Sequence, residues 1–334
     1  RGFRGGGGES AAALLALGAG FAHGVALPLD ARDEFDDFLG GEACPDVIGV
    51  NHYLTSERYL DEAARAGYTY TELGPFGYNP TDPARLRDEL AKRNLTLTGA
   101  TVGTRLQRGR SVLQEAKDAC KAAAETIKPQ GAEYLIILPE GTTDLDGRVV
   151  IDETLTDDEW RNLTSLHDEL GRYCLEELGL KLTYHSHADS HVGTQAEIIR
   201  LLENTDPRYV NLCLDTGHVA YCNADNLALI RQFPERIAYV HLKQVNPTLR
   251  DRAHAERMGF PPACRAGVMV EPPLGVPEMP PVLEALAALD RDLWCIVEQD
   301  MIGCSVDAPF PVAKRTCEYF ASVGLGAGRP LAAR

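Results

Sequence analysis

The hydrophobic and polar positions of the chain repeat one pattern from Pro45 onward. A short run rich in β-branched and aromatic residues is followed by a turn and then by an amphipathic stretch with helical spacing. The short runs predict eight strands, at Val47–Asn51, Tyr68–Leu73, Leu95–Val102, Tyr134–Leu138, Leu180–Tyr184, Tyr209–Leu214, Ile237–His241 and Leu293–Val297. The stretches between them predict helices, one opening near Ser56 and others at Asp82–Arg93, Val112–Ile127, Thr156–Glu177, Thr194–Leu202 and Val312–Val323.

This alternation predicts an α/β fold with a parallel sheet, because parallel neighbours need a crossover connection. The later strands are apolar along their whole length, which suits strands covered on both faces. Eight units in about 290 residues match a closed (β/α)₈ TIM barrel in count and size. A doubly wound open sheet is the alternative. It would normally carry a glycine-rich phosphate turn after the first strand, and Val50-Asn51-His52-Tyr53 has none.

The predicted organisation is a single barrel domain at residues 45–325, with an N-terminal extension at 1–44 and a C-terminal tail at 326–334. Residues 1–8 are rich in Gly and Arg, and the following run to Leu27 is weakly apolar with many small residues. We expect this extension to be disordered or loosely packed. A targeting segment is the alternative, since Arg1 and Arg4 precede an Ala/Leu stretch, although glycines interrupt it.

One predicted connection is too long for a simple turn. Between the seventh and eighth strands, Asn246–Pro280 carries many Pro and Gly residues. A loop of this length in a compact domain is usually functional or disordered. Because it follows the carboxyl end of a strand, we expect it to act as a lid.

Composition and charge narrow the function classes. The net charge of −16 argues against nucleic acid as the main partner, because binding to a phosphate backbone needs a basic surface. Nine cysteines without regular spacing fit reduced, mostly buried thiols better than a disulfide framework. No apolar stretch approaches the ~20 residues of a membrane span. We therefore expect a cytoplasmic protein with neither nucleic acid nor membrane as a partner.

Side chains that can bind metal stand where five successive apolar runs stop. They are Glu140 after the fourth strand, His185 and His187 after the fifth, Asp215 and His218 after the sixth, His241 at the end of the seventh with Lys243 beyond it, and Glu298 after the eighth. The carboxyl ends of barrel strands converge on one mouth, where barrel enzymes keep their sites. The sequence therefore predicts one polar site at this mouth.

The residue types in this set predict a divalent metal ion. The ligands are imidazoles and carboxylates without a cysteine, which favours Mn²⁺, Co²⁺, Fe²⁺ or Zn²⁺ and leaves Mg²⁺ possible. Of these ions we favour Mn²⁺ or Co²⁺. Such an ion holds two vicinal oxygens of a substrate and acidifies the carbon or hydroxyl between them, while neighbouring carboxylates and histidines move the protons.

Three of these residues also have a structural explanation when taken alone. Asp215 suits a turn cap, because Asp-Thr-Gly is favourable turn chemistry. A single His such as His241 is more often a hydrogen-bonded core residue than a ligand, and Glu298 could pair with Lys243 across the mouth. If every strand end had such a separate explanation, five unrelated polar residues would lie together at one end of the barrel by chance. We therefore prefer the metal site.

At these residues the sequence resembles the xylose isomerase-like TIM-barrel superfamily, which includes sugar epimerases, hydroxypyruvate isomerases and AP endonuclease-like proteins. Within it the chain most resembles the inosose dehydratases, which remove water from a keto-inositol. The likeness runs from about Pro45 to Phe320. The matching pieces are Thr71-Glu72-Leu73-Gly74, Glu140, Thr156-Asp157-Asp158-Glu159-Trp160, Tyr184-His185-Ser186-His187, Asp215-Thr216-Gly217-His218, Val240-His241-Leu242-Lys243 and Glu298-Gln299-Asp300.

The resemblance implies that Asp215, His241 and Glu298 bind the metal. Many members of the superfamily use a Glu of the fifth strand as the fourth ligand, and this chain carries His185 there. His185 lies as far from its strand's end as Asp215 does, so we expect it to be the fourth ligand, with Glu140 as the alternative. The residues implied to line the substrate pocket are Glu72, His187, His218 and Lys243.

The missing Glu also bears on the reaction. Epimerases of the superfamily pass a proton between two carboxylates, one on each face of the substrate. This chain fits one-sided proton abstraction and loss of water, with His185 or Glu140 as the base, Glu298 as a further catalytic carboxylate, and His187 or His218 as the acid. Two features depart from the family pattern: Gln244 stands where Asp is usual after His-Leu-Lys, and the segment before the eighth strand is longer and rich in Pro.

The leading expectation is therefore a metal-dependent lyase that dehydrates a keto-inositol or related keto-polyol through an enediolate. A sugar (phosphate) isomerase or epimerase acting on a ketose is the second possibility, and an AP endonuclease-like DNA repair protein is a remote one that the acidic balance disfavours. A non-catalytic sugar-binding barrel is the fourth. Barrels of this group often pair, so a homo-oligomer is compatible with the sequence.

Overall fold

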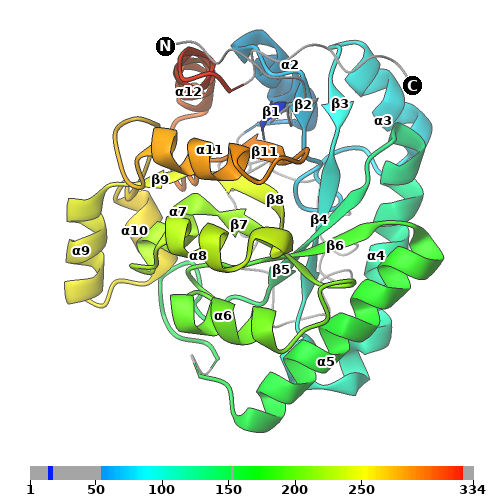
Figure 1. The fold of residues 1–334 in the computed structure, drawn as a ribbon. Helices are drawn as coiled ribbons and strands as arrows, with labels where there is room; N and C mark the ends of the chain where they lie inside the picture. The colour runs from blue at the N-terminus through cyan, green and yellow to red at the C-terminus, as the bar shows by residue number, and fades with distance from the viewer. Residues whose placement is uncertain (1–13, 18–53, 152–153, 326–334) are drawn as a thin grey trace.

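The computed structural model describes residues 14–17, 54–151 and 154–325 of the chain. Its main sheet has the strand order β3-β2-β1-β11-β8-β7-β6-β5-β4, and every neighbouring pair is parallel. The strands are β1 (Leu14–Leu17), β2 (Tyr70–Thr71), β3 (Thr96–Leu97), β4 (Gly99–Thr104), β5 (Tyr134–Pro139), β6 (Lys181–His185), β7 (Asn211–Asp215), β8 (Ile237–Leu242) and β11 (Trp294–Val297). The sheet lies inside the helices (Figure 1).

The two edges of this sheet meet and close the barrel. Strands β3 and β4 are separated only by Thr98, so they form one strand in two parts. This strand pairs with β5 on one side and with β2 on the other, where Leu73 N donates to Gly99 O (2.9 Å) and Thr101 N donates to Gly74 O (3.1 Å). Eight strand positions therefore close into a (β/α)₈ barrel, and the predicted fold class is confirmed.

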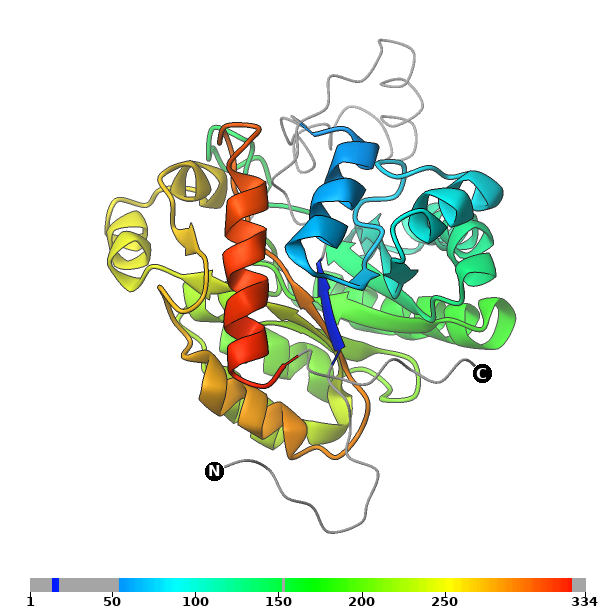
Figure 2. The same cartoon turned by 90° about the horizontal axis from the view of Figure 1, so that it is seen from above.

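The first strand position differs from the prediction. It is filled by β1, which pairs in parallel with β11 and β2 (dark blue in Figure 2). This strand belongs to the 1–44 segment, for which the sequence predicted no element, while the expected strand Val47–Asn51 lies outside the described residues. The Leu-Leu-Ala-Leu run of β1 has no alternation and lies in a stretch of Ala and Gly, so its pattern carried no strand signal.

Helices follow the strands and cover the outside of the barrel. The larger ones are α2 (Ser56–Ala66), α3 (Pro83–Ala91), α4 (Leu113–Ile127), α5 (Asp157–Tyr173), α6 (Gln195–Glu203), α11 (Met279–Ala287) and α12 (Pro309–Ser322), and the short α7 (Thr216–Tyr221) and α8 (Asn226–Gln232) follow β7. A capping box opens α5, since Thr156 Oγ1 accepts from Glu159 N and Glu159 Oε2 accepts from Thr156 N. Beyond α5 a π-helical turn ends at Gly179, whose φ of 68° lies in the left-handed region.

Alternation along the strands decides which side chains point into the barrel. Tyr134, Ile136, Cys213, Tyr239 and Ile296 form a separate buried cluster within it. Successive residues of a strand point to opposite faces, so the residue two positions further along points the same way. The next inward positions are therefore Asp215 after Cys213, His241 after Tyr239 and Glu298 after Ile296. The apolar cluster thus forms the floor on which the polar mouth stands.

The expected lid is a small folded unit, which we call the insertion (residues 244–278). It contains the antiparallel pair β9 (Gln244–Val245) and β10 (Met269–Val270), and the helices α9 (Pro247–Ala255) and α10 (Phe260–Arg265). Its own apolar cluster joins it to Ala220 and Tyr221 of α7. Both views place α9 and α10 at one side of the barrel (Figures 1 and 2).

A histidine buried between α5 and the barrel should make stability depend on pH. His167 Nδ1 lies 2.6 Å from Leu163 O, and burial lowers the His167 pKa from 6.5 to about 4. The folded protein therefore holds His167 in its neutral form, whereas the unfolded chain takes up a proton near pH 6.5. The contribution of His167 to the free energy of unfolding is complete above pH 6.5 and is lost as the pH falls toward 4. Between pH 7 and pH 4, His167→Gln should lose about 3 kcal/mol less of its unfolding free energy than the wild type, as measured by urea unfolding. Equal losses in both proteins would contradict this prediction, and His254→Gln on the exposed face of α9 is the control.

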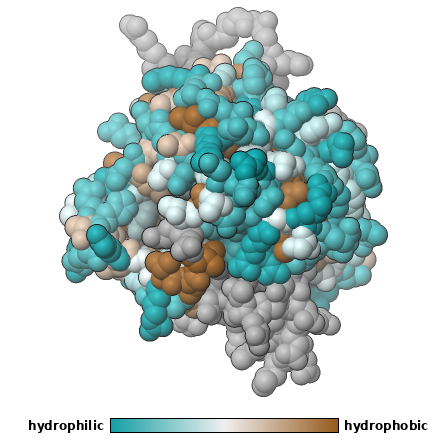
Figure 3. Space-filling model, turned by 90° about the horizontal axis from the view of Figure 1, so that it is seen from below, coloured by the Kyte–Doolittle hydropathy of each residue, from teal (hydrophilic) through white to brown (hydrophobic). Residues whose placement is uncertain are grey.

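The outer surface is mostly hydrophilic in the view from below, with small separate hydrophobic areas (Figure 3). Within the described part of the chain, no helix combines the length and apolar character needed to cross a bilayer. All cysteines in the same residues are free thiols, as the sequence predicted.

Candidate metal centre

Four side chains predicted as metal ligands meet at the carboxyl ends of four adjacent strands. His185 ends β6, Asp215 ends β7, His241 lies near the end of β8, and Glu298 follows β11 directly. One ligand atom of each lies within 4.8 Å of the ligand atoms of the other three. All four residues are buried, with exposed fractions of 8% or less. The fold thus brings together residues that are 113 positions apart at most in the sequence.

The contacts within this group fit a bound cation. His185 Nε2 lies 3.3 Å from Asp215 Oδ2, and His241 Nδ1 lies 3.1 Å from Glu298 Oε2 and 3.7 Å from Asp215 Oδ2. The Nδ1 atoms of both histidines are buried without a hydrogen bond. A buried polar atom without a partner is costly, and a metal ion would satisfy such nitrogens. Two imidazoles and two carboxylates are also a donor set that borderline divalent ions accept.

Glu72 lies behind His241 and orients it. Its Oε2 is 3.0 Å from His241 Nε2, and Thr101 Oγ1 donates to its Oε1 at 2.6 Å. A carboxylate on the far nitrogen of a histidine fixes the ring and leaves the other nitrogen to bind a metal. Here that other nitrogen is Nδ1, which faces Asp215 and Glu298. The sequence predicted Glu72 as a pocket residue, whereas its contacts support a role in holding His241.

Lys243 balances the negative charge of the centre. Its Nζ lies 3.1 Å from Asp215 Oδ2, 3.0 Å from Glu298 Oε2 and 3.2 Å from Asp300 Oδ2, and the residue is fully buried. Burial lowers the Lys243 pKa, but Asp215, Asp300 and Glu298 outweigh it and raise the pKa well above its usual value. Lys243 is therefore a fixed cation. Asp300 was given no role from sequence, although it stands two positions after Glu298, on the same side of the chain.

His187 and His218 form a neutral pair beside this charge cluster. Their ring centroids are 3.9 Å apart, and burial is the main reason why the pKa of each lies well below the usual value. The backbone N–H of Asp189 donates to His187 Nδ1 (3.3 Å), which places the proton of the neutral ring on Nε2. His187 is therefore a hydrogen-bond donor at the mouth.

Glu140 lies outside the metal-capable groups found among the described residues. Both of its oxygens are occupied: Oε2 accepts from Gln107 Nε2 (2.8 Å) and Arg108 Nε (3.0 Å), and Oε1 pairs with Arg108 Nη2. The sequence left His185 and Glu140 as alternatives for the fourth ligand. Only His185 lies with the other three, because Arg108 and Gln107, in the 3₁₀ turn Leu106–Arg108 after β4, hold Glu140.

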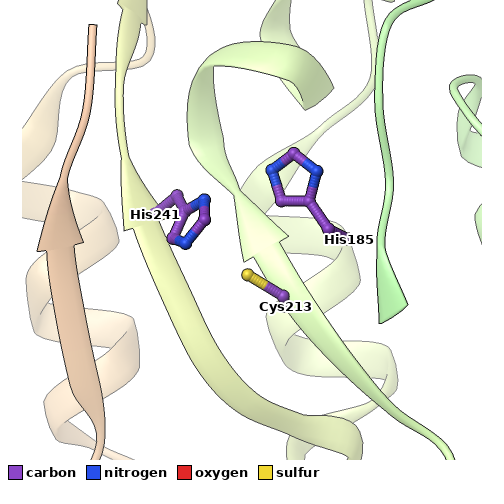
Figure 4. A group of neighbouring side chains, drawn as sticks. All are labelled: His185, Cys213 and His241. Atoms are coloured by element: carbon purple, nitrogen blue, oxygen red, sulfur yellow. The ribbon is translucent and has the colours of Figure 1, made fainter. Parts of the chain in front are cut away.

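Cys213 forms a second group with two of the same residues. One ligand atom each of His185, Cys213 and His241 lie within 4.8 Å of one another, and the sulfur points toward the two rings (Figure 4). Burial raises the Cys213 pKa to about 11. The ligand set predicted from the sequence contains no cysteine, because Cys213 stands inside the apolar run Val210–Leu214. Its position two residues before Asp215 was the available signal.

The chain is similar to known proteins over most of its length. Residues 60–322 match the family described as xylose isomerase-like TIM barrel. An inosose dehydratase of Geobacillus kaustophilus is 34% identical over 279 residues, which cover 82% of this chain and 89% of the relative. Another from Geobacillus thermodenitrificans is 31% identical, covering 82% and 91%. The chain belongs to the xylose isomerase-like TIM-barrel family.

This family membership confirms the resemblance seen in the sequence. These relatives are enzymes, and this chain of the family is an enzyme as well. Among solved structures, the zinc-bound IOLI protein superimposes with a TM-score of 0.60 at 16% identity and covers 93% of this chain and 97% of its own. At that identity the likeness shows the shared barrel. The matched range 60–322 contains every side chain of the centre described above.

In this xylose isomerase-like barrel the insertion covers the mouth. The ring of Phe260, the first residue of α10, lies 5.2 Å from that of His187 and 5.1 Å from that of His218. The insertion is held against the loop after β5 by a close contact of Gly259 with Gly147, and by Arg265 Nη1, which donates to Leu145 O (2.6 Å). Phe260 therefore forms an apolar roof over the two neutral imidazoles.

The glycine contact predicts how firmly this roof is held. A Cβ on Gly259 would lie 2.4 Å from Gly147 Cα, while the φ of Gly259, −60°, suits any residue. Gly259→Ala should therefore cost about 1–3 kcal/mol through overpacking and lower amide-exchange protection of residues 244–278 about 10- to 100-fold. Thr248→Ala, at an exposed position of α9 within the same insertion, is the control. Unchanged protection in Gly259→Ala would show that the contact does not hold the insertion.

Proposed function

We propose that the chain is a divalent-metal-dependent dehydratase that removes water from a keto-inositol or a related keto-polyol. The observation that carries this proposal is the convergence of His185, Asp215, His241 and Glu298 in a chain 34% identical to an inosose dehydratase. The small-molecule substrate would enter at the mouth beneath Phe260.

The four converging side chains would hold one ion, and the mixed imidazole and carboxylate set favours Mn²⁺ or Co²⁺, with Zn²⁺, Fe²⁺ and Mg²⁺ as other possibilities. When bound, such an ion polarises a carbonyl group and so acidifies the adjacent C–H. With His185, Asp215, His241 and Glu298 as its protein ligands, the ion could also accept oxygens of the substrate.

The remaining residues supply charge and a hydrogen bond. Lys243, fixed as a cation between Asp215 and Glu298, would attract electron-rich oxygens of the substrate. The departing hydroxyl also needs stabilisation. His187 would hydrogen-bond it through Nε2–H, because its Nδ1 already accepts from Asp189 N.

Glu140 fits a positioning role better than that of the base. Both oxygens of this carboxylate bind Arg108 or Gln107, and these contacts fix its position. Its bidentate contact holds the Arg108 guanidinium, whose side chain is 36% exposed, at the rim of the mouth. We therefore propose that Glu140 fixes Arg108 as a contact for substrate hydroxyl or carbonyl oxygens.

The test is turnover of a keto-inositol by metal-free protein to which Mn²⁺ or Co²⁺ is restored. We expect loss of one water, followed by mass spectrometry, to depend on the ion and to disappear with chelator. Exchange of substrate C–H protons with solvent at two adjacent carbons without loss of water would instead establish an isomerase or epimerase. Ligand binding that persists in an Asp215→Ala/Glu298→Ala double variant in metal-free buffer would establish a binding protein.

Glu72 offers a milder test of the centre. Glu72→Gln keeps the shape of the side chain but removes the charge that orients His241, so the affinity for Mn²⁺ should fall about 10- to 100-fold, as for other outer partners of ligating histidines. Isothermal titration measures this change. Thr101→Val removes only the hydrogen bond to Glu72 and should have a smaller effect. Unchanged affinity in Glu72→Gln would argue against His241 as a ligand.

A further inference from the structure

Cys213 stands at the floor of the proposed centre, one inward position below Asp215 on β7. It is fully buried and packs in the same cluster as Ile136, Tyr239 and Ile296. Cys295 of β11 is equally buried, but it lies in the layer between the barrel and the helices. Cys213 and Cys295 are thus equally buried, but only Cys213 faces the barrel interior. Its position beside the histidines follows from that orientation.

Those neighbours are two imidazoles with free coordinating capacity. His185 and His241 each place a ligand atom within 4.8 Å of the sulfur and of each other, and Figure 4 shows both rings beside it. The Nδ1 atom of each ring is buried without a hydrogen bond. A thiol with two such nitrogens provides three ligands of a tetrahedral site and leaves the fourth position open.

The two ligand sets differ in chemistry while sharing both histidines. Asp215 and Glu298 add carboxylate oxygens, which suit hard ions such as Mn²⁺ and Mg²⁺, whereas Cys213 adds a sulfur, which suits thiophilic ions. Because His185 and His241 belong to both sets, one ion excludes the other.

We propose that His185, Cys213 and His241 form a second metal site, which takes a thiophilic divalent ion such as Cd²⁺ or Zn²⁺. The S–H proton passes to solvent as the sulfur–metal bond forms, and no oxidation takes place. The existence of this site does not depend on the proposed function. Its consequence does: a thiophilic ion bound there would block binding of the hard ion that activates the enzyme.

The test uses Cd²⁺ added to the full-length, metal-free protein. We expect a sulfur-to-cadmium charge-transfer absorption that saturates at one ion per chain in the wild type and in Cys295→Ser. The absorption should be lost in Cys213→Ser. The affinity for Cd²⁺ should also fall at least about tenfold, because loss of a residue that only hydrogen-bonds to a metal ligand already lowers metal affinity by that factor. X-ray absorption of the Zn²⁺-loaded protein should show one sulfur at about 2.3 Å in the wild type and none in Cys213→Ser.

Competition with Mn²⁺ completes the test. Cd²⁺ should displace Mn²⁺ from the wild type and from Cys295→Ser more effectively than from Cys213→Ser, with each protein compared against its own Mn²⁺ affinity. A charge-transfer band that survives in Cys213→Ser, or stoichiometric Cd²⁺ binding to the wild type without such a band, would overturn the proposal. Failure of the proposed function would appear separately, as Mn²⁺ binding without turnover of a keto-inositol.

Discussion

Replacing Asp215 by Asn is expected to abolish tight binding of a divalent ion while the helix that follows it stays in place. Asp215 has two separate tasks. Its Oδ1 accepts from the backbone N–H groups of Gly217 and His218, both at 2.8 Å, and so caps α7. Its Oδ2 faces His185, His241 and Lys243. The cap weighed for this residue from sequence is therefore confirmed on Oδ1, while its role as a metal ligand, through Oδ2, stays a prediction.

The substitution separates these tasks because Asn is as good an N-cap as Asp but lacks the charge that binds a cation. Mn²⁺ affinity should fall more than about 100-fold. This loss is larger than the one expected on removing a residue that only hydrogen-bonds to a metal ligand. Isothermal titration of metal-free protein measures the affinity, and the loss of water from substrate should fall with it.

Asp225→Asn is the matched control for this change. Asp225 caps α8 through a hydrogen bond from Ala228 N (3.0 Å), so the same substitution at the next helix alters charge and cap but does not touch the centre. It should leave Mn²⁺ affinity unchanged. If both variants bind Mn²⁺ as the wild type does, the converging residues are a structural ion-pair network and the metal proposal fails.

Replacing Lys243 by Met is expected to destabilise the metal-free protein by about 3–5 kcal/mol, the usual cost of removing one partner from a buried ion pair. The Lys243 ammonium is fully buried and touches Asp215, Glu298 and Asp300, so Met leaves three carboxylates close together without a cation. Met fills a similar volume, which keeps the packing loss small. Chemical unfolding in the presence of chelator measures the change.

Metal should reverse much of this loss. An ion present at 100 times its dissociation constant stabilises the folded state by about 3 kcal/mol, and in the variant it would also supply the missing positive charge. Lys314→Met is the control, because Lys314 forms only an exposed pair with Glu318 on α12 and should change stability by about 1 kcal/mol or less. Equal stability of wild type and Lys243→Met under chelator would show that the carboxylates carry little charge.

The sequence by itself determined the barrel and the place of its site. Seven of the eight strand positions were read from runs rich in β-branched and aromatic residues that match β2 to β8 and β11. The later runs are continuously apolar, because strands buried on both faces leave such a signal. The polar residues that end these runs were found for the same reason, since each interrupts a buried run at the mouth. His185, Asp215, His241 and Glu298 follow this rule, and the structure brings all four together.

Tertiary structure alone decided the partners of these residues. Glu140 follows the same strand-end rule, yet Arg108 holds it, because the turn after β4 folds over it. Glu72 and His241 meet although the strands β2 and β8 are not neighbours in the sheet, so only the closed barrel places these two side chains together. The insertion was visible only as a long connection rich in Pro and Gly, and its docking through Gly147 and Gly259 depends on backbone contacts without a sequence pattern.

The same division explains the first strand and the floor of the site. The four residues of β1 form a strand through pairing with β11 and β2, neighbours far along the chain that local pattern does not encode. Cys213 looks like any core thiol within its apolar run, and only the fold sets it against two histidines. Local sequence therefore specifies which faces are buried, because burial follows side-chain polarity and period, whereas the pairing of charges and ligands depends on which strands become neighbours.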